Sequence, residues 1–510
     1  MREKNTLGGF AFPHAVVRPI SIVADRFVFS TEACATMAEI TTESRRDDSP
    51  DEDAAIPSDA LVFFGATGDL AYKKIFPALQ AMVLHRNLNI PIIGVAFSNW
   101  TNEQLKNRAR ESIKEYCPDV SDADFAKFAK LLRYVDGDYQ RPDTFEKLRG
   151  ELGGAKRPIH YLAIPPSLFP TVIEGLGKSG CAKNARVIVE KPFGRDLQSA
   201  RLLNRVLHAV FRESDVFRID HYLGKEAVQN LVFFRFGNTF LEPIWNRHYI
   251  KSVQITMAEN FGITGRGKLY EETGAIRDVV QNHLLQVVGF LAMEPPATTY
   301  ADSMRDEQVK VFRMTRPLNG DNLIRGQYRR YRREQEVAPN SQVETYAAVR
   351  LFIDSWRWEG VPFFIRAGKY LPCTVTEVLV ELKRPPIGKF FPNQGNYVRF
   401  RLSPEVLIGI GARIKRPGEA WNGETVELSA VKQPSGDEMD PYERLLGDAM
   451  DGEGILFTRE DAVEAAWQIV QPILGNQTPV FEYEQKTWGP READLLVAEF
   501  GGWHDPVAKM

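Results

Sequence analysis

The sequence predicts an α/β protein with a Rossmann-like, doubly wound N-terminal domain and a C-terminal α+β domain that holds a large, mainly antiparallel sheet. In the first half, continuous apolar runs of strand length alternate with helical patterns, as in a parallel sheet covered on both faces. In the second half, apolar and polar residues alternate, which is typical of antiparallel strands with one polar face. Because 510 residues suffice for two large domains, we place them at 59–218 and 219–510.

The composition narrows the classes of function. A hydrophobic content of 44%, a charged content of 26% and a net charge of −3 give no reason to expect a nucleic-acid or membrane partner. No apolar run reaches the roughly 18 residues of a membrane span. The cysteines have neither a disulfide pattern nor metal-ligand spacing; they are Cys34, Cys117, Cys181 and Cys373. We therefore expect a cytoplasmic protein without a metal site.

Residues 1–58 differ from the rest and are predicted to be a disordered extension. Residues 41–58 are polar and acidic and contain no aromatic residue. Residues 1–40 lack the compact apolar segment of a secretory signal. A natural start at Met37 and a cleaved organellar peptide both remain open.

A glycine-rich turn follows the first apolar run, 60–64. The turn reads Gly65-Ala-Thr-Gly-Asp-Leu70, and a helical pattern begins directly after it. Glycines let the backbone approach a pyrophosphate, and the start of a helix presents free N–H groups to the anion. A plain tight turn is the other interpretation of so short a motif. The flanking strand and helix favour a dinucleotide site with the cofactor-binding residues Gly65, Thr67, Gly68, Asp69 and Leu70.

The second strand, predicted at 90–96, ends in Phe97-Ser-Asn99. A carboxylate at this place favours NAD and an arginine favours NADP, and the chain has neither. Lys73, Lys74 or Arg108 could supply a cation from elsewhere, so the residues leave the choice of cofactor open.

Further strands are predicted at 158–164 and 185–190, and a helix at 195–212. Ligands of open parallel sheets bind beyond the carboxyl ends of the strands. Glu190 and Lys191 end the second of these strands and are therefore expected at a cofactor or substrate site.

The octapeptide Arg218–Lys225 carries two cations, a carboxylate, an imidazole and a phenol. It lies where the first domain should pass into the second, so its side chains can face a cofactor across a cleft. A solvated surface loop is the alternative. We interpret the octapeptide as the floor of an active site.

The second half contains four alternating runs, at 249–257, 345–353, 376–383 and 396–402. The basic cluster 325–333 has acidic residues close behind it, which indicates a solvated surface patch rather than a nucleic-acid site.

Residues 274–291 have the apolar spacing of a helix, and His283 lies on the apolar stripe. A buried histidine is often only a core residue, but an imidazole near a carboxylate is also suited to act as a general base. Glu259 and Asp278 are carboxylates in this region. Their spacing does not place them together.

Several motifs, in this order, resemble the glucose-6-phosphate dehydrogenase family. They are Gly65–Leu70, Glu190-Lys-Pro-Phe-Gly194, Arg218–Glu226, Gly265-Arg-Gly267, Asp278–Leu285 and Phe364-Ile-Arg-Ala-Gly-Lys369. The resemblance extends from about residue 59 to Trp503.

The resemblance implies oxidation of D-glucose 6-phosphate to 6-phospho-D-glucono-1,5-lactone with hydride transfer to NAD(P), the first step of the oxidative pentose phosphate pathway. It also implies NADP as the cofactor and a homodimer or homotetramer that forms through the C-terminal sheet.

The resemblance also assigns roles to residues. His283 is the base that takes the proton of the sugar C1 hydroxyl, and Asp220 orients this base. The matching substrate-binding residues are Lys191, His221, Tyr222, Lys225, Glu259, Asp278 and Lys369, and Lys191 also contacts the cofactor.

Two positions depart from the family pattern. Phe97 replaces the usual arginine for the 2′-phosphate, so we expect that NAD can serve as well as NADP. Thr374 stands where many relatives have a second phosphate-binding cation. A related sugar dehydrogenase and a non-catalytic regulatory relative remain alternatives, although Asp220, His283 and Lys225 are all present.

Overall fold

A computed structural model describes residues 56–298, 300–386, 395–418, 423–431 and 439–507. Most of the predicted disordered extension, including Met37, lies outside the described residues. Within the described ranges, no helix is both long enough and apolar enough to cross a membrane.

The first half is a six-stranded parallel sheet in the order β3-β2-β1-β4-β5-β6, which confirms the doubly wound prediction. Its strands are β1 Ala60–Phe64, β2 Ile92–Ala96, β3 Leu132–Asp136, β4 Pro158–Leu162, β5 Arg186–Glu190 and β6 Val216–Ile219. The strand order reverses between β1 and β4. A ligand site is therefore expected beyond the carboxyl ends of these two strands.

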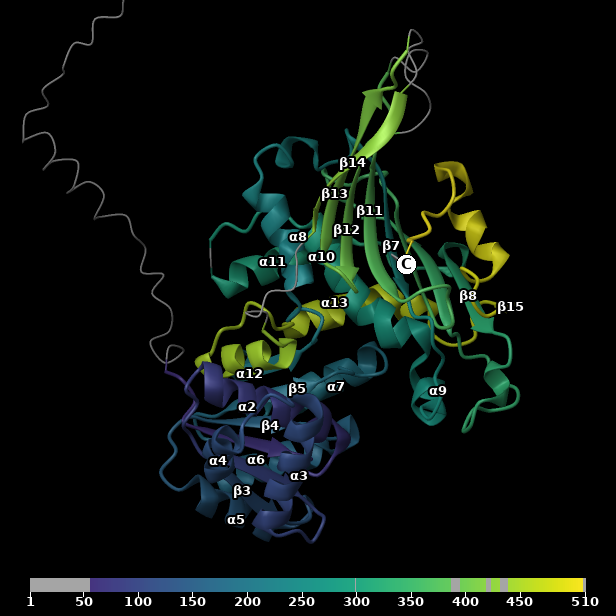
Figure 1. Ribbon diagram of the computed structural model, residues 1–510. Coiled ribbons are helices and arrows are strands. Elements are labelled where there is room, and N and C mark those ends of the chain that lie inside the picture. The colour runs from purple at the N-terminus through teal and green to yellow at the C-terminus, as the bar shows by residue number, and fades with distance from the viewer. Residues whose placement is uncertain (1–55, 299, 387–394, 419–422, 432–438, 508–510) are drawn as a thin grey trace, which may run out of the picture. The chain divides into compact units, whose positions relative to one another are not determined.

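Helices cover both faces of this sheet (Figure 1). They are α2 Phe76–His85, α3 Asn102–Tyr116, α4 Asp122–Leu131, α5 Pro142–Leu152, α6 Phe169–Ser179 and α7 Leu197–His208. Helix α7 begins later than predicted because the Asp196 side chain accepts from the backbone N–H of Ser199 and caps the helix.

The second half is a nine-stranded sheet in the order β14-β13-β12-β11-β7-β10-β9-β8-β15. Only the β10–β7 and β15–β8 pairs are parallel, so the mainly antiparallel prediction is confirmed. The strands are β7 Ile250–Ala258, β8 Leu323–Tyr328, β9 Tyr346–Leu351, β10 Phe363–Gly368, β11 Val375–Leu382, β12 Tyr397–Ser403, β13 Leu407–Lys415, β14 Gly423–Val431 and β15 Val480–Tyr483.

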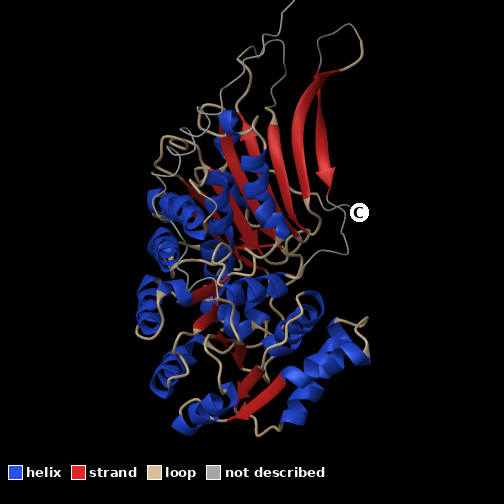
Figure 2. Cartoon of the chain, turned by 90° about the vertical axis from the view of Figure 1, so that its left-hand side faces the viewer, coloured by secondary structure: helices blue, strands red, loops and turns tan. Residues whose placement is uncertain are grey.

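Helices lie along one face of the nine-stranded sheet (Figure 2), where α8 Glu226–Gly237, α10 Leu285–Ala292 and α11 Ala301–Met314 share an apolar core with β7, β9 and β10. Helix α9 Gly267–Ala275 instead contributes Tyr270 to a second apolar cluster, together with Tyr346 and Ala348 of β9. The single helix predicted at 274–291 is three consecutive segments, because a π-helix, η5 Ile276–Leu284, separates α9 from α10. Gly274 breaks α9 with a φ of 60°, and a Cβ there would meet the Glu344 carboxylate at 2.5 Å.

Two late helices, α12 Pro441–Asp451 and α13 Glu460–Val470, return to the first sheet. The Met450 carbonyl accepts from the backbone N–H of Ser58 at 2.8 Å. The Trp467 indole donates to the Phe193 carbonyl at 2.9 Å. The two halves are therefore joined by a segment far down the chain.

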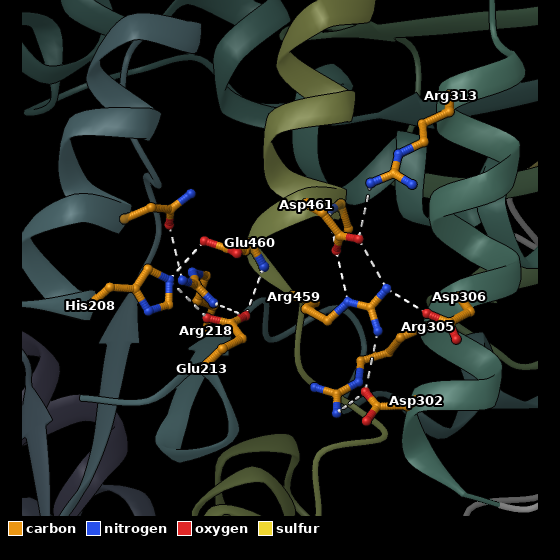
Figure 3. A network of polar contacts seen from close by, with 12 residues as sticks. His208, Glu213, Arg218, Asp302, Arg305, Asp306, Arg313, Arg459, Glu460 and Asp461 are labelled. Atoms are coloured by element: carbon orange, nitrogen blue, oxygen red, sulfur yellow. Dashed lines mark hydrogen bonds and ion pairs between the residues drawn. The ribbon is translucent and has the colours of Figure 1, made fainter.

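A network of charged side chains reinforces this junction (Figure 3). Beside α7, His208 Nε2 lies 2.7 Å from Glu460 and 3.4 Å from Glu213. On the other side of α13, Arg459 pairs with Asp306 of α11 at 2.5 Å and with Asp461 at 2.8 Å.

The basic cluster 325–333 is only partly the solvated patch that we predicted. Arg325 lies in β8, is 1% exposed and pairs with Glu344 at 3.3 Å. The cluster's other arginines are exposed. The prediction was wrong for Arg325 because a buried carboxylate compensates the charge of the guanidinium.

Candidate active site

The carboxyl ends of β1, β4, β5 and β6 carry most of the first half's predicted site residues. The glycine turn follows β1, and Tyr161 of β4 donates to Glu190 at the end of β5 at 2.6 Å. Lys191 follows β5, and Asp220 follows β6. All of these groups therefore lie at one edge of the sheet.

The glycine turn is closed tightly against β4. Gly65 has a φ of 80°, and a Cβ there would lie 2.3 Å from the Ala163 carbonyl oxygen. The N–H of Gly68 donates to the Gly65 carbonyl at 2.9 Å, and a π-helix starts at Ala71. A glycine cradle before a helix start fits a dinucleotide pyrophosphate.

The loop after β2 lies beside this turn. Ser98 Oγ is 2.9 Å from Thr67 Oγ1, and the N–H of Ser98 donates to Asp136 at 3.1 Å. Phe97 is 65% exposed. Asp136, at the end of β3, anchors the loop, and no pattern in the sequence predicts this role.

The cations that could replace an arginine at Phe97 are partly engaged. Lys73 pairs with Asp69 at 3.1 Å, and the Arg108 guanidinium stacks on the Tyr72 ring at 3.9 Å. Leu70 directly precedes the π-helix η1 Ala71–Ile75.

The centre of the site is a contact between an imidazole and a carboxylate. His283 Nδ1 lies 2.5 Å from Asp220 Oδ1, and both side chains are buried. His283 Nε2 lies 2.9 Å from the Lys191 ammonium, which can only donate. These contacts assign the proton to Nδ1 and leave Nε2 as the acceptor, which is occupied by a Lys191 N–H.

The electrostatics suit this assignment. Burial lowers the pKa of His283, the Lys191 charge lowers it further, and Asp220 partly opposes the shift. Burial alone would raise the pKa of Asp220, but the charges of the two histidines and of Lys191 bring it well below its usual value. At neutral pH the pair is thus a carboxylate and a neutral imidazole.

Aromatic rings enclose His283. The His221 ring meets it edge-on at 4.8 Å, and the Tyr222 ring stacks on it at 4.9 Å. The Lys225 ammonium lies 4.3 Å from the Tyr222 ring centre. Burial lowers the pKa of Lys225 and, together with the charge of His283, lowers the pKa of His221 to about 3.

Carboxylates and lysines complete the cluster from the second half. The Lys191 ammonium lies 3.7 Å from Asp278, and Lys369 lies 3.8 Å from the other oxygen of Asp278. Lys369 also pairs with Glu259 at the end of β7. The structure therefore links all nine predicted catalytic and substrate-binding residues through direct contacts.

Thr374 lies at the rim of this cluster. Its hydroxyl donates to the Asn260 side chain at 2.8 Å and accepts from the Asn260 N–H at 3.1 Å. Asn260 follows Glu259, so Thr374 stabilises the loop that carries this carboxylate.

Tyr442, the second residue of α12, lies at the site although no sequence pattern predicts it there. Its ring is parallel to that of His221, with 6.4 Å between ring centres. Burial raises the pKa of the neighbouring Glu190 to about 7, and this carboxyl interacts with Tyr161 and Tyr442. No local signal connects Tyr442 to the octapeptide, because more than 200 positions separate them.

The arrangement offers three kinds of chemistry. A neutral imidazole backed by a carboxylate can take a proton from a hydroxyl. Buried carboxylates can accept sugar hydroxyls, and several cations can hold a phosphate dianion. A glycine turn at the same sheet edge can hold a dinucleotide.

Comparisons with known proteins agree with this geometry. Residues 62–230 match the family "Glucose-6-phosphate dehydrogenase, NAD binding domain", and residues 232–504 match "Glucose-6-phosphate dehydrogenase, C-terminal domain". Glucose-6-phosphate 1-dehydrogenase 1 of Mycobacterium tuberculosis is 43% identical over 455 residues, which are 88% of this chain and 97% of that protein. Glucose-6-phosphate 1-dehydrogenase of Aspergillus niger is 38% identical, and the match covers 86% of this chain and 91% of that protein.

Solved structures give the same result. The crystal structure of glucose-6-phosphate 1-dehydrogenase from Mycobacterium avium superposes with a TM-score of 0.84 at 44% identity, covering 89% of this chain and all of that one. A glucose-6-phosphate dehydrogenase in complex with glucose 6-phosphate has a TM-score of 0.82 at 35% identity with the same coverage. On these matches to both halves, the chain belongs to the glucose-6-phosphate dehydrogenase family.

Proposed function

We propose that this dehydrogenase oxidises D-glucose 6-phosphate to 6-phospho-D-glucono-1,5-lactone, the first step of the oxidative pentose phosphate pathway, with His283 as the base. The observation that carries the proposal is the buried contact between His283 and Asp220 at the sheet edge that holds the glycine turn.

His283 Nε2 takes the proton of the C1 hydroxyl. Asp220 holds Nδ1–H, fixes the tautomer and stabilises the imidazolium that forms. Lys191 lies at Nε2, where the hydroxyl must bind, so its ammonium moves aside when the sugar enters. Asp278, 3.7 Å from this ammonium, can receive it.

The substrate is held by groups of opposite kinds. Glu259 and Asp278 accept sugar hydroxyls, whereas Lys225, Lys369, His221 and Tyr222 bind the phosphate. The Thr374 hydroxyl carries no charge, so the phosphate depends on fewer cations than in many relatives. Lys369 pairs with Glu259 and lies near Asp278. These contacts support the division, because the sugar hydroxyls could take over the two carboxylates while the phosphate takes over the ammonium.

The cofactor is held by Gly65, Thr67, Gly68, Asp69, Leu70 and Lys191. When bound, the nicotinamide supplies the hydride acceptor. The exposed Phe97 offers no charge to a 2′-phosphate, so we propose that the enzyme uses NAD as well as NADP.

We also propose the division into an NAD(P)-binding domain at 59–218 and a substrate-binding and oligomerisation domain at 219–510. The strands β1–β5 and β7–β15 fall on either side of this boundary and support it, and β6 crosses it by one residue. A homodimer or homotetramer formed by the nine-stranded sheet and a cytoplasmic location belong to the same proposal. Light scattering after gel filtration would measure the oligomer.

The decisive assay mixes the purified protein with glucose 6-phosphate or free glucose and with NAD or NADP, and follows the absorbance of the reduced nicotinamide. We expect glucose 6-phosphate to be strongly preferred and both cofactors to be reduced. Equal rates with free glucose would overturn the substrate. A preference for NADP above about a hundredfold, or about 2.7 kcal/mol, would overturn the cofactor proposal.

A further inference from the structure

A cavity lined by arginines takes no part in the proposed chemistry. It has a volume of about 430 Å³ and lies where the chain leaves β8 through a short 3₁₀ helix, η7 Tyr331–Arg333. Its lining includes Arg329, Arg330, Arg332, Arg333 and Glu482.

Most of this positive charge is not compensated. Arg329 pairs with Glu482 at 3.1 Å and also with Glu484. Arg332 uses its Nε to donate to the Ser341 carbonyl at 3.0 Å.

Among the described residues, the side chains of Arg330 and Arg333 have no hydrogen-bond or ion-pair partner. The nearby Glu334 accepts from the Tyr328 hydroxyl at 3.1 Å and does not line the cavity. Three guanidinium groups therefore remain available, and their planar forks suit phosphate oxygens.

The lining of the cavity offers no exposed aromatic face to a nucleic-acid strand. Single strands are held by exposed aromatic faces on which bases stack. Here Tyr328 and Tyr331 are each 1% exposed and pack edge-to-face at 5.4 Å. We propose that this arginine cavity binds a compact, multiply phosphorylated small molecule that acts as an effector of the enzyme.

The buried tyrosines connect the cavity to the candidate active site. The Tyr331 hydroxyl donates to Glu271 of α9 at 2.6 Å, and α9 leads into the π-helix that carries Asp278 and His283. A ligand that draws the arginines together would therefore disturb the helix beneath the substrate.

A second connection runs to the phosphate-binding lysine. The Tyr328 ring lies 4.8 Å from that of Tyr370, which follows Lys369. We expect the effector to raise KM for glucose 6-phosphate. This effect rests on the proposed function, whereas the binding itself does not.

Binding can be measured by titration calorimetry of the full chain with inorganic tripolyphosphate at fixed ionic strength. We expect R330A/R333A to bind at least tenfold more weakly than the wild type. The control R133A/R149A loses the same charge at exposed positions of the first half and should stay within twofold. Orthophosphate should bind at least tenfold more weakly than tripolyphosphate.

No binding by the wild type, or equal losses in both double variants, would overturn the cavity as a site. Circular dichroism checks folding, and R330Q/R333Q replaces the alanine pair if that pair misfolds.

Steady-state kinetics tests the effector role. Tripolyphosphate should raise KM for glucose 6-phosphate at least twofold in the wild type and not in R330A/R333A. Tyr331→Phe should keep the binding and lose the change in KM. An unchanged KM in the wild type, or a Tyr331→Phe variant that responds like the wild type, overturns the coupling. An enzyme inactive on glucose 6-phosphate would instead contradict the proposed function and leave the calorimetry valid.

Discussion

The cofactor edge and the substrate face of this site are assembled in different ways. Most of the edge comes from one short stretch, which runs from β1 and its glycine turn to the loop after β2, and only Lys191 is added from further along the chain. The substrate face takes its groups from β5, β6, β7, η5 and β10, which are spread over roughly a third of the chain. A local motif can therefore identify the edge, whereas only tertiary packing creates the face. We expect changes on the substrate face to alter turnover and sugar binding, and changes on the cofactor edge to alter only the preference between NAD and NADP.

The largest effect is expected for His283→Asn. Removal of the base should lower kcat by about 10³- to 10⁴-fold and leave KM for glucose 6-phosphate nearly unchanged. Steady-state kinetics measures both constants. The control His248→Asn removes an exposed imidazole and should behave as the wild type. Turnover near the wild-type level in His283→Asn would show that His283 is not the base.

Asp220→Asn should lower kcat by about 10²- to 10³-fold, because an amide can hold the wrong tautomer of His283. The pH profile gives an independent readout. Activity requires neutral His283, whose pKa already lies below its usual value, and the Asp220 charge raises that pKa. Without this charge, the acid limb of kcat/KM should move to lower pH. A move to higher pH would contradict the assigned pair.

Lys369→Ala should raise KM for glucose 6-phosphate by about 10- to 100-fold, because a charge-assisted hydrogen bond contributes about 1.5–3 kcal/mol. The effect on kcat should be smaller, since the lysine binds the substrate phosphate and not the reacting carbon. Comparison with free glucose checks this, because its rate should be nearly insensitive to the change. If the variant lost the same activity with glucose 6-phosphate and with free glucose, Lys369 would not be a phosphate-binding residue.

Phe97→Arg tests the edge and should give the smallest effect. A guanidinium beside Ser98 can pair with a 2′-phosphate, so KM for NADP should fall by about tenfold while KM for NAD stays constant. Kinetics with each cofactor at saturating substrate measures the ratio. An unchanged ratio would show that another cation, such as Arg108, already serves this role.

The same contrast explains how far the sequence predicts the structure. The strand Ala60–Phe64 was predicted to the residue, because it is wholly buried and apolar. Strand β3 was missed because only Leu132 and Val135 are buried in it. Local patterns found the octapeptide and the apolar stripe around His283.

Features that depend on distant partners were not predictable. The pattern at 274–291 could not reveal the π-helix, whose start depends on Gly274 packing against Glu344. The Glu344 carboxylate also pairs with Arg325. This pairing allows Arg325 to be buried, although the sequence predicted a solvated position. Tyr442 reaches the site only because α12 folds back across the first sheet.

This return of α12 and α13 also bears on how the protein can be dissected. A fragment that stops near residue 230, where the two family matches meet, would lack the acceptor of the Ser58 N–H and the indole that binds Phe193. The apolar surface of α2 would lose its cover, and such a fragment should be prone to aggregate when expressed alone. Separate production of a nucleotide-binding piece therefore needs residues 439–470 supplied as well, by circular rearrangement of the gene or as a second polypeptide.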